Sequence, residues 1–101
     1  MSDTIEKLVK TIRSRKGSDV KSSYTSFLLS KGNDHCLSKL KEEVAELESA
    51  IKNKKNTVHE TVDVIYHLLV TLESAGINFD HIITELKKRE NSSGFEEKRN
   101  R

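Results

Sequence analysis

Two short runs of acidic residues repeat the spacing of one helical turn. They are the pattern Glu-Glu-x-x-Glu that begins at Glu42 and the pattern Glu-x-x-Asp that begins at Glu60. On an α-helix, residues three apart lie one above the other, so Glu43 and Glu46 share a face while Glu42 points more nearly away. Glu60 and Asp63 share a face for the same reason. If both runs are helical, each helix presents a vertical pair of carboxylates.

The second pair lies in the most apolar stretch of the chain, residues 58–72. An ionised carboxylate without a partner there is costly, so Asp63 requires a compensating charge. Thirteen residues separate Glu46 from Glu60, and a short antiparallel connection of this length would bring the two pairs face to face. Carboxylate oxygens gathered around one cavity suit Mg²⁺, with Mn²⁺ as an alternative. The expected metal ligands are Glu43, Glu46, Glu60 and Asp63.

A simpler interpretation of the acidic residues needs no metal. Glu-x-x-Glu is common on helices, and a solvated acidic face paired with Lys39, Lys41 or Lys52 would account for the first run. The presence of both runs on consecutive helices, the second within an apolar helix, favours the metal site. We expect His67 to be a buried histidine bonded to a neighbour rather than a ligand, and the lone Cys36 leaves too few ligands for zinc.

Apolar residues spaced three and four apart predict the helices that carry these carboxylates. One such seam predicts a helix from Asp34 to about Asn53, followed by a polar loop and by Thr57 as the N-cap of the next helix. That next helix, up to about Gly76, is apolar round most of its circumference, which is typical of a central, buried helix. Similar patterns predict helices over residues 3–17, over 24–31 with Ser22 or Ser23 as its cap, and from Asn78 or Asp80 to Arg89.

Length and composition favour a small all-α fold. The chain has 101 residues, of which 34% are apolar and 34% charged, with no proline. We expect one domain over residues 1–101, built as a bundle of four to five helices with a polar C-terminal tail at 91–101. Because a domain of this size buries a thin core, we expect a homodimer to complete it.

The sequence predicts a cytoplasmic protein without a membrane partner. It has no apolar run of the roughly 20 residues that a bilayer requires, and its first residues lack a signal pattern. The single cysteine fits a reducing compartment.

Charges are segregated along the chain. Residues 42–85 carry nine acidic and three basic side chains, whereas residues 1–41 carry nine basic and four acidic, and residues 86–101 six basic and three acidic. Basic ends around an acidic middle fit an anionic ligand held next to a cation. The modest net charge of +2 and the lack of a nucleic-acid motif argue against a nucleic-acid partner.

Several segments resemble the MazG-like all-α nucleoside triphosphate pyrophosphohydrolases, and among them the phosphoribosyl-ATP pyrophosphohydrolase family. They are Ser-Ser-Tyr-Thr at 22–25, Leu-Leu-Ser-Lys-Gly at 28–32, Lys-Glu-Glu-Val-Ala-Glu at 41–46, Glu-Thr-Val-Asp-Val-Ile-Tyr-His-Leu-Leu-Val at 60–70 and Ser-Gly-Phe-Glu-Glu-Lys at 93–98. The resemblance covers about residues 3–99. The chain departs from the family at Lys41, where a small residue is usual.

This resemblance implies a hydrolase that cleaves phosphoribosyl-ATP into phosphoribosyl-AMP and pyrophosphate, in histidine biosynthesis. It implies that Mg²⁺ ions held by the four carboxylates contact the phosphates and activate a water molecule, and that Glu42 holds a further ion or orients water. The implied catalytic residues are Glu42, Glu43, Glu46, Glu60 and Asp63. The implied phosphate contacts are Lys31, Lys39, Arg89 and Lys98, and the implied contacts to sugar or base are Ser23, Tyr24 and Thr25.

Two other functions fit the same residues. One is a house-cleaning pyrophosphohydrolase that acts on non-standard nucleoside triphosphates. The other is a non-catalytic helical module whose basic ends bind RNA or an acidic partner.

Overall fold

The computed structural model describes residues 3–90 and 94–99, without the side chains of 95–97. All secondary structure in the described residues is helical, which confirms the predicted all-α fold. The helices are α1 (Asp3–Arg15), α2 (Tyr24–Lys31), α3 (Asn33–Asn53), α4 (Thr57–Ser74), α5 (Phe79–Arg89) and α6 (Gly94–Arg99).

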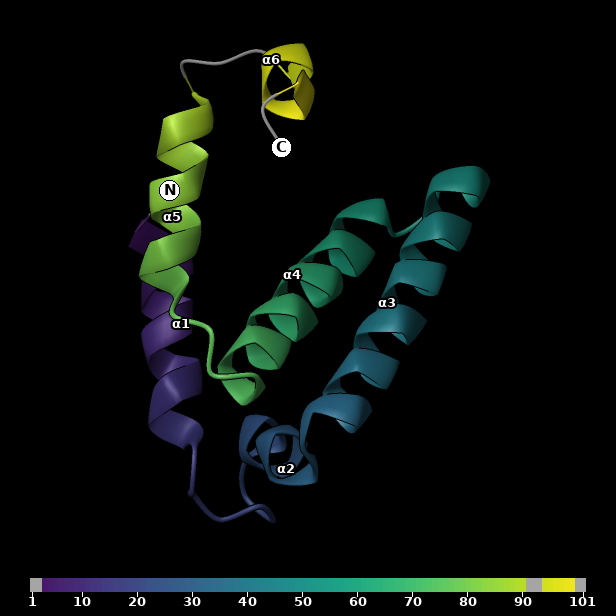
Figure 1. The fold of residues 1–101 in the computed structure, drawn as a ribbon. Coiled ribbons are helices and arrows are strands. Elements are labelled where there is room, and N and C mark those ends of the chain that lie inside the picture. The colour runs from purple at the N-terminus through teal and green to yellow at the C-terminus, as the bar shows by residue number, and fades with distance from the viewer. Residues whose placement is uncertain (1–2, 91–93, 100–101) are drawn as a thin grey trace.

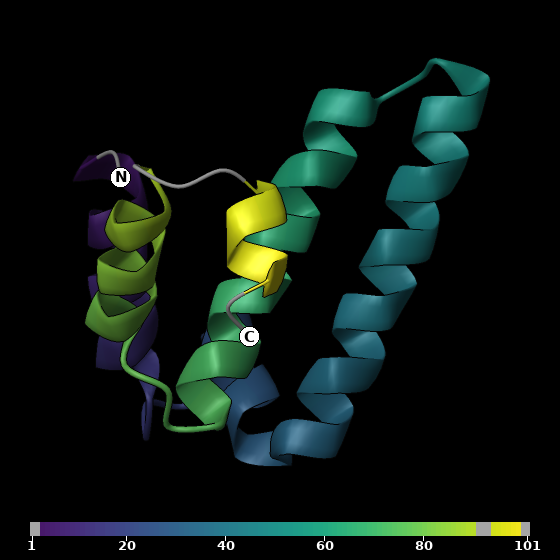
Figure 2. The ribbon, with the colours of Figure 1, turned by 45° about the horizontal axis from the view of Figure 1, so that its top comes forward.

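The two longest helices, α3 and α4, form an antiparallel hairpin that carries both acidic runs (Figure 1). The short helix α2 packs against both of them at the open end of the hairpin. Helices α1 and α5 lie side by side in both views, with α4 between them and α3 (Figures 1 and 2). The acidic hairpin is therefore supported from one side and open on the other.

The predicted N-cap residue is confirmed at two helices and is wrong at a third. The Ser23 side chain accepts the Ser26 N–H, and the Asn78 side chain accepts the Asp80 N–H, so each residue caps its helix. The prediction that Thr57 caps α4 is wrong. Asn56 is the N-cap, and the Thr57 hydroxyl instead donates to the Ala50 carbonyl at the end of α3.

The core lies between the hairpin and the shorter helices. Ile12 of α1, Leu28 of α2, Cys36 of α3 and Val70 of α4 are almost fully buried, and Phe79 of α5 joins them. The thiol of Cys36 donates to the Leu28 carbonyl, which ties α3 to α2. These contacts fix the end of the hairpin at which α2 packs.

Helix α4 is central, as predicted, but in the single chain it is buried along one side only. Helix α4 buries His67, Leu69 and Val70, but Val58 is 80% exposed and Val62 57% exposed. Part of the apolar seam of α3 is also exposed, at Leu37, Val44 and Ile51. That helix turns Cys36, Glu43 and Ala50 toward its neighbours instead. Both long helices thus present an apolar stripe to solvent.

Part of the predicted polar tail is helical, since α6 spans Gly94–Arg99. Residues 91–93 and 100–101 of that tail lie outside the described residues. In the part of the chain that the structure describes, every helix is too short or too polar to cross a bilayer.

Candidate active site

The α3–α4 hairpin brings acidic side chains from both runs together. One carboxylate oxygen each from Glu43, Glu46 and Glu60 lies within 4.8 Å of the others. Glu60 also belongs to a second group of this kind, with Asp63 and His59. The four predicted ligands therefore lie in two adjoining groups that share Glu60, and we call Glu43, Glu46, Glu60 and Asp63 the acidic cluster.

The cluster contains polar atoms that are buried without a partner. Glu43 Oε2 and Glu60 Oε2 are inaccessible to solvent and form no hydrogen bond. Burial and the nearby negative charges of Glu46, Asp63 and Glu60 raise the pKa of Glu43 to about 7. Burial and the charge of Glu46 also raise the pKa of Glu60. The folded chain thus holds carboxylates where their ionised forms are unfavourable, unless a cation is bound.

We expect the stability of the metal-free protein to fall as pH rises. A carboxyl group whose pKa is raised by folding stabilises the fold below its unfolded pKa, and this contribution is lost as pH rises through the folded value of about 7. Burial lowers the pKa of His67 below its ordinary 6.5, and this effect opposes the trend only in part, because it changes stability mainly below about pH 7. Thermal denaturation in EDTA should therefore give a lower Tm at pH 8 than at pH 6.5.

Added Mg²⁺ is expected to reverse this trend, because a cation bound at the cluster would favour the ionised carboxylates. The gain in Tm on adding Mg²⁺ should be larger at pH 8 than at pH 6.5. A metal-free Tm that is flat or rises over this pH interval would show that folding does not raise the pKa of the carboxyl groups in the cluster.

His67 forms part of the wall beside the cluster. It is buried, as expected, and its Nε2 lies 3.8 Å from Glu43 Oε1, beyond hydrogen-bond length. Its ring meets the rings of Tyr66 and Tyr24 edge-on. Since burial lowers the pKa of His67, it stays neutral at pH 7 and adds no charge to the cluster.

Sequence reasoning missed His59. Its Nε2 lies 3.3 Å from Asp63 Oδ2, so it forms an ion pair with that carboxylate when it is protonated. The signal was present, because His59 and Asp63 are four apart and so share a helical face. His59 is an additional candidate ligand at the edge of the cluster.

Two other residues near the cluster point elsewhere. Glu42 is exposed and belongs to neither group of carboxylates. Its Oε2 is 3.2 Å from Lys39 Nζ, an ion pair that raises the pKa of Lys39. Lys41 is exposed, and at about 100° per residue it lies some 140° round α3 from Glu46. Lys41 therefore does not crowd the acidic cluster of its own chain.

Aromatic side chains surround the α2 end of the site. Tyr24 is 54% exposed, and its ring stacks on those of Phe27 and Tyr66 with centroids 6.3 and 6.5 Å away. Thr25 and Tyr66 share a hydrogen bond between their hydroxyl groups. Together with the edge contact of His67, these residues form a platform that reaches the acidic cluster; we call Tyr24, Phe27 and Tyr66 the aromatic platform.

The remaining predicted phosphate contacts lie at varied distances from the cluster. Lys31 Nζ sits over the Phe27 ring, 5.5 Å from its centroid. Arg89 ends α5 on the side of the molecule occupied by α1, and its Nε is 3.2 Å from Glu85 Oε1. Lys98 is exposed on α6. Of the four predicted phosphate contacts, Lys39 is the one that lies on the same helix as the first acidic run.

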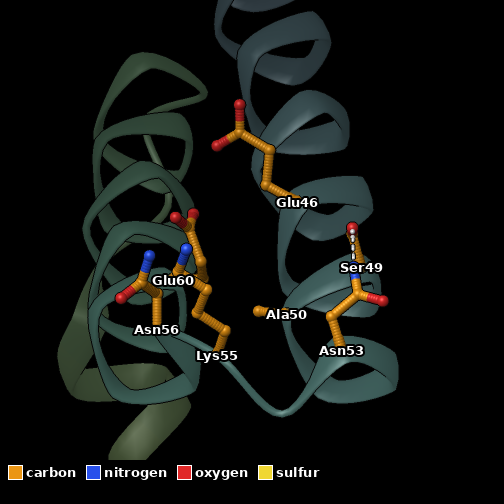
Figure 3. Close-up of a pocket in the computed structure, with 7 residues that line it drawn as sticks. All are labelled: Glu46, Ser49, Ala50, Asn53, Lys55, Asn56 and Glu60. Atoms are coloured by element: carbon orange, nitrogen blue, oxygen red, sulfur yellow. Dashed lines mark hydrogen bonds between the residues drawn. The ribbon is translucent and has the colours of Figure 1, made fainter.

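A polar pocket of about 310 Å³ adjoins the cluster at the α3–α4 turn (Figure 3). Glu46 and Glu60 stand at one end of it, and Lys55 extends from the turn toward Glu60. The side chains of Asn53 and Ser49 are joined by a hydrogen bond along its α3 side. Ala50 and Asn56 complete the lining.

Comparison with known proteins places this arrangement in a family. The family model described as Phosphoribosyl-ATP pyrophosphohydrolase matches residues 5–90. The Phosphoribosyl-ATP pyrophosphatase of Dechloromonas aromatica is 43% identical, over 98% of this chain and 94% of its own length. The protein of the same name from Bacillus cereus is 44% identical, over 88% of this chain and 85% of its own length.

A bifunctional relative is similar over part of its length. The Histidine biosynthesis bifunctional protein HisIE of Wolinella succinogenes is 41% identical over 96% of this chain, which spans 43% of that protein. The family model covers both acidic runs and the hairpin that joins them, and the two Phosphoribosyl-ATP pyrophosphatases are similar over most of their own length. The chain belongs to the phosphoribosyl-ATP pyrophosphohydrolase family.

Proposed function

We propose that this protein is a Mg²⁺-dependent hydrolase that converts phosphoribosyl-ATP to phosphoribosyl-AMP and pyrophosphate, a step of histidine biosynthesis in the cytoplasm. The observation that carries this proposal is the acidic cluster, in which Glu43, Glu46 and Glu60 converge from two helices with buried oxygen atoms left without partners. Family membership supplies the substrate.

The residues present fit a divalent cation. The cluster offers only hard oxygen donors from its four carboxylates, which suits Mg²⁺ or Mn²⁺. Glu43 Oε2 and Glu60 Oε2 are acceptors that lack a donor, and Asp63 stands beside Glu60. When bound there, Mg²⁺ would neutralise phosphate charge and lower the pKa of a water molecule. Glu43, Glu46, Glu60 and Asp63 would hold it.

The other residues of the site position the substrate. The exposed ring of Tyr24 offers a flat apolar surface for a purine base, and it is held in place by stacking on Phe27 and Tyr66. The hydroxyl of Thr25 is fixed by Tyr66. Lys39 remains next to Glu42 at the rim, where it meets the charge of a phosphate group.

We also propose that two copies of this chain form a homodimer through the apolar stripes of the hairpin. Leu37, Val44 and Ile51 of α3 are exposed, as are Val62, Ile65 and Leu68 of α4. Large apolar side chains in such continuous rows are typical of interfaces between subunits. A second copy of this chain is the partner that fits these rows, since it carries the same two apolar stripes and they are equally exposed to solvent.

The test is release of pyrophosphate from phosphoribosyl-ATP, with Mg²⁺ and with EDTA. We expect turnover with Mg²⁺ and none with EDTA, and a kcat/KM for phosphoribosyl-ATP far above those for dUTP and dCTP. A preference for dUTP or dCTP would indicate a hydrolase of non-standard nucleotides. Absence of turnover with all three, in folded protein, would refute the proposal.

A further inference from the structure

The pocket at the α3–α4 turn joins two kinds of charge. Its upper end is formed by the carboxylates of Glu46 and Glu60, and Lys55 places an ammonium group on the same cavity (Figure 3). The amides of Asn53 and Asn56 and the hydroxyl of Ser49 add hydrogen-bonding groups. Ala50 is the one apolar residue in this lining, so the pocket suits a small, highly charged group rather than a base.

The turn holds the backbone of Lys55 in place. The Lys55 N–H donates to the Ala50 carbonyl at 3.1 Å, and the Lys54 N–H donates to the Ile51 carbonyl at 3.4 Å. Lys54 adopts the left-handed conformation with φ of 55°, so this pair of bonds forms the motif that commonly terminates a helix. The Thr57 hydroxyl donates to the same Ala50 carbonyl. Lys55 is thus anchored at its backbone, and its side chain extends along the pocket.

A cation at Glu46 and Glu60, together with the ammonium of Lys55, would present two positive centres to one cavity. Consecutive phosphate groups match this arrangement, because each carries anionic oxygens that accept from an ammonium and bind a cation. The volume of about 310 Å³ is at the small end for ligand pockets. A diphosphate group fits this small volume and the two positive centres. A nucleoside carries no negative charge to bind them.

The aromatic platform lies at the opposite end of the site. Its exposed residue, Tyr24, begins α2, which packs at the open end of the hairpin, while the pocket lies at the closed end. Along α3, Lys39 at the platform end and Asn53 at the pocket end are separated by about 21 Å of helix, with Glu43 and Glu46 between them. The site therefore runs from an apolar end, through the carboxylates, to a basic end.

The geometry points to Lys55 as the residue that binds the pyrophosphate portion of the substrate, so that phosphoribosyl-ATP lies along α3 with its base toward α2 and its terminal phosphates toward the turn. This inference rests on the proposed function. The bond between the α and β phosphates then lies over the acidic cluster. Of the two products, pyrophosphate remains on the Lys55 side and phosphoribosyl-AMP on the Tyr24 side.

The experiment compares three variants of the full chain, Lys55→Gln, Lys55→Arg and Lys54→Gln. Lys54 is the matched control, because it is the neighbouring exposed lysine and does not line the pocket. Inhibition by each product is measured separately, and binding of inorganic pyrophosphate in the presence of Mg²⁺ is measured by calorimetry. Lys55→Gln should weaken pyrophosphate binding about tenfold and leave inhibition by phosphoribosyl-AMP unchanged. Lys55→Arg should restore most of the affinity, and Lys54→Gln should behave as the wild type.

The outcomes separate this inference from the proposed function. Wild-type turnover with pyrophosphate affinity that does not depend on Lys55 overturns the inference and leaves the function standing. Binding of pyrophosphate that depends on Lys55, without turnover, supports the pocket and refutes the function. Equal losses of affinity for both products in Lys55→Gln overturn the assigned orientation.

Discussion

Replacing Glu43 with glutamine is expected to stabilise the metal-free protein while it abolishes most of its activity. Glutamine has the same shape but no charge, so it removes both the burial of an ionised carboxylate and the repulsion from its neighbours, which together raise the pKa of Glu43 to about 7. In EDTA at pH 8, the Tm should rise by several degrees, since a change of 1 kcal/mol shifts the Tm of a domain this size by about 4–8 °C. Turnover of phosphoribosyl-ATP should fall by about a hundredfold to a thousandfold.

The same variant should lose its response to metal. Addition of Mg²⁺ should raise the Tm of the wild type clearly and that of Glu43→Gln only slightly, because one of the oxygen ligands is now a neutral amide. Glu48→Gln is the matched control, since Glu48 is on the same helix but forms an exposed pair with Lys52. It should change neither activity nor the effect of Mg²⁺. A Glu43→Gln protein with wild-type turnover would refute the metal site.

Replacing Val62 with glutamate is expected to convert the homodimer to monomer. Val62 is 57% exposed in the single chain and lies on the apolar stripe of α4. Glutamate there remains solvated in the monomer, but it would be buried without a partner in the interface. Dimer dissociation should become at least about a hundredfold more favourable, which corresponds to about 2.8 kcal/mol. Analytical ultracentrifugation across a concentration series measures this change.

The control for this variant is Thr84→Glu, an exposed position of α5 outside the stripe. It should sediment as the wild type does. Because Val62 is so exposed, the Val62→Glu monomer should keep its helical circular dichroism. A wild type that is monomeric at all concentrations would refute the proposed dimer, as would a Val62→Glu variant that still dimerises with the affinity of the wild type.

The sequence predicted the hairpin and its acidic pairs because both depend on local spacing. Residues three apart on a helix must share a face, so Glu43 with Glu46 and Glu60 with Asp63 follow from geometry once the helices are recognised. The structure adds the unpartnered oxygen atoms of Glu43 and Glu60, which depend on contacts between helices. Spacing alone does not report burial of individual atoms.

Other features could not be derived from spacing because they depend on which neighbour a helix face meets. The apolar pattern of α4 shows that a face must be covered, but it does not distinguish the chain's own core from a second copy, and Val58 is 80% exposed in the single chain. The N-cap of α4 was missed for a related reason. Asn56 adopts a left-handed φ of 60°, and the hydroxyl of Thr57 is used by the end of α3.

The central claim is that carboxylates from α3 and α4 bind divalent cations together. A crystal soaked in Mn²⁺ tests this most directly, because manganese gives an anomalous signal that no protein oxygen produces. We predict an anomalous difference peak within coordination distance of Glu46 and Glu60, with Glu43 and Asp63 beside it. The opposite result is a fully soaked crystal in which these four carboxylates lie too far apart to share a cation and no anomalous peak lies between the two helices. That result would contradict the claim.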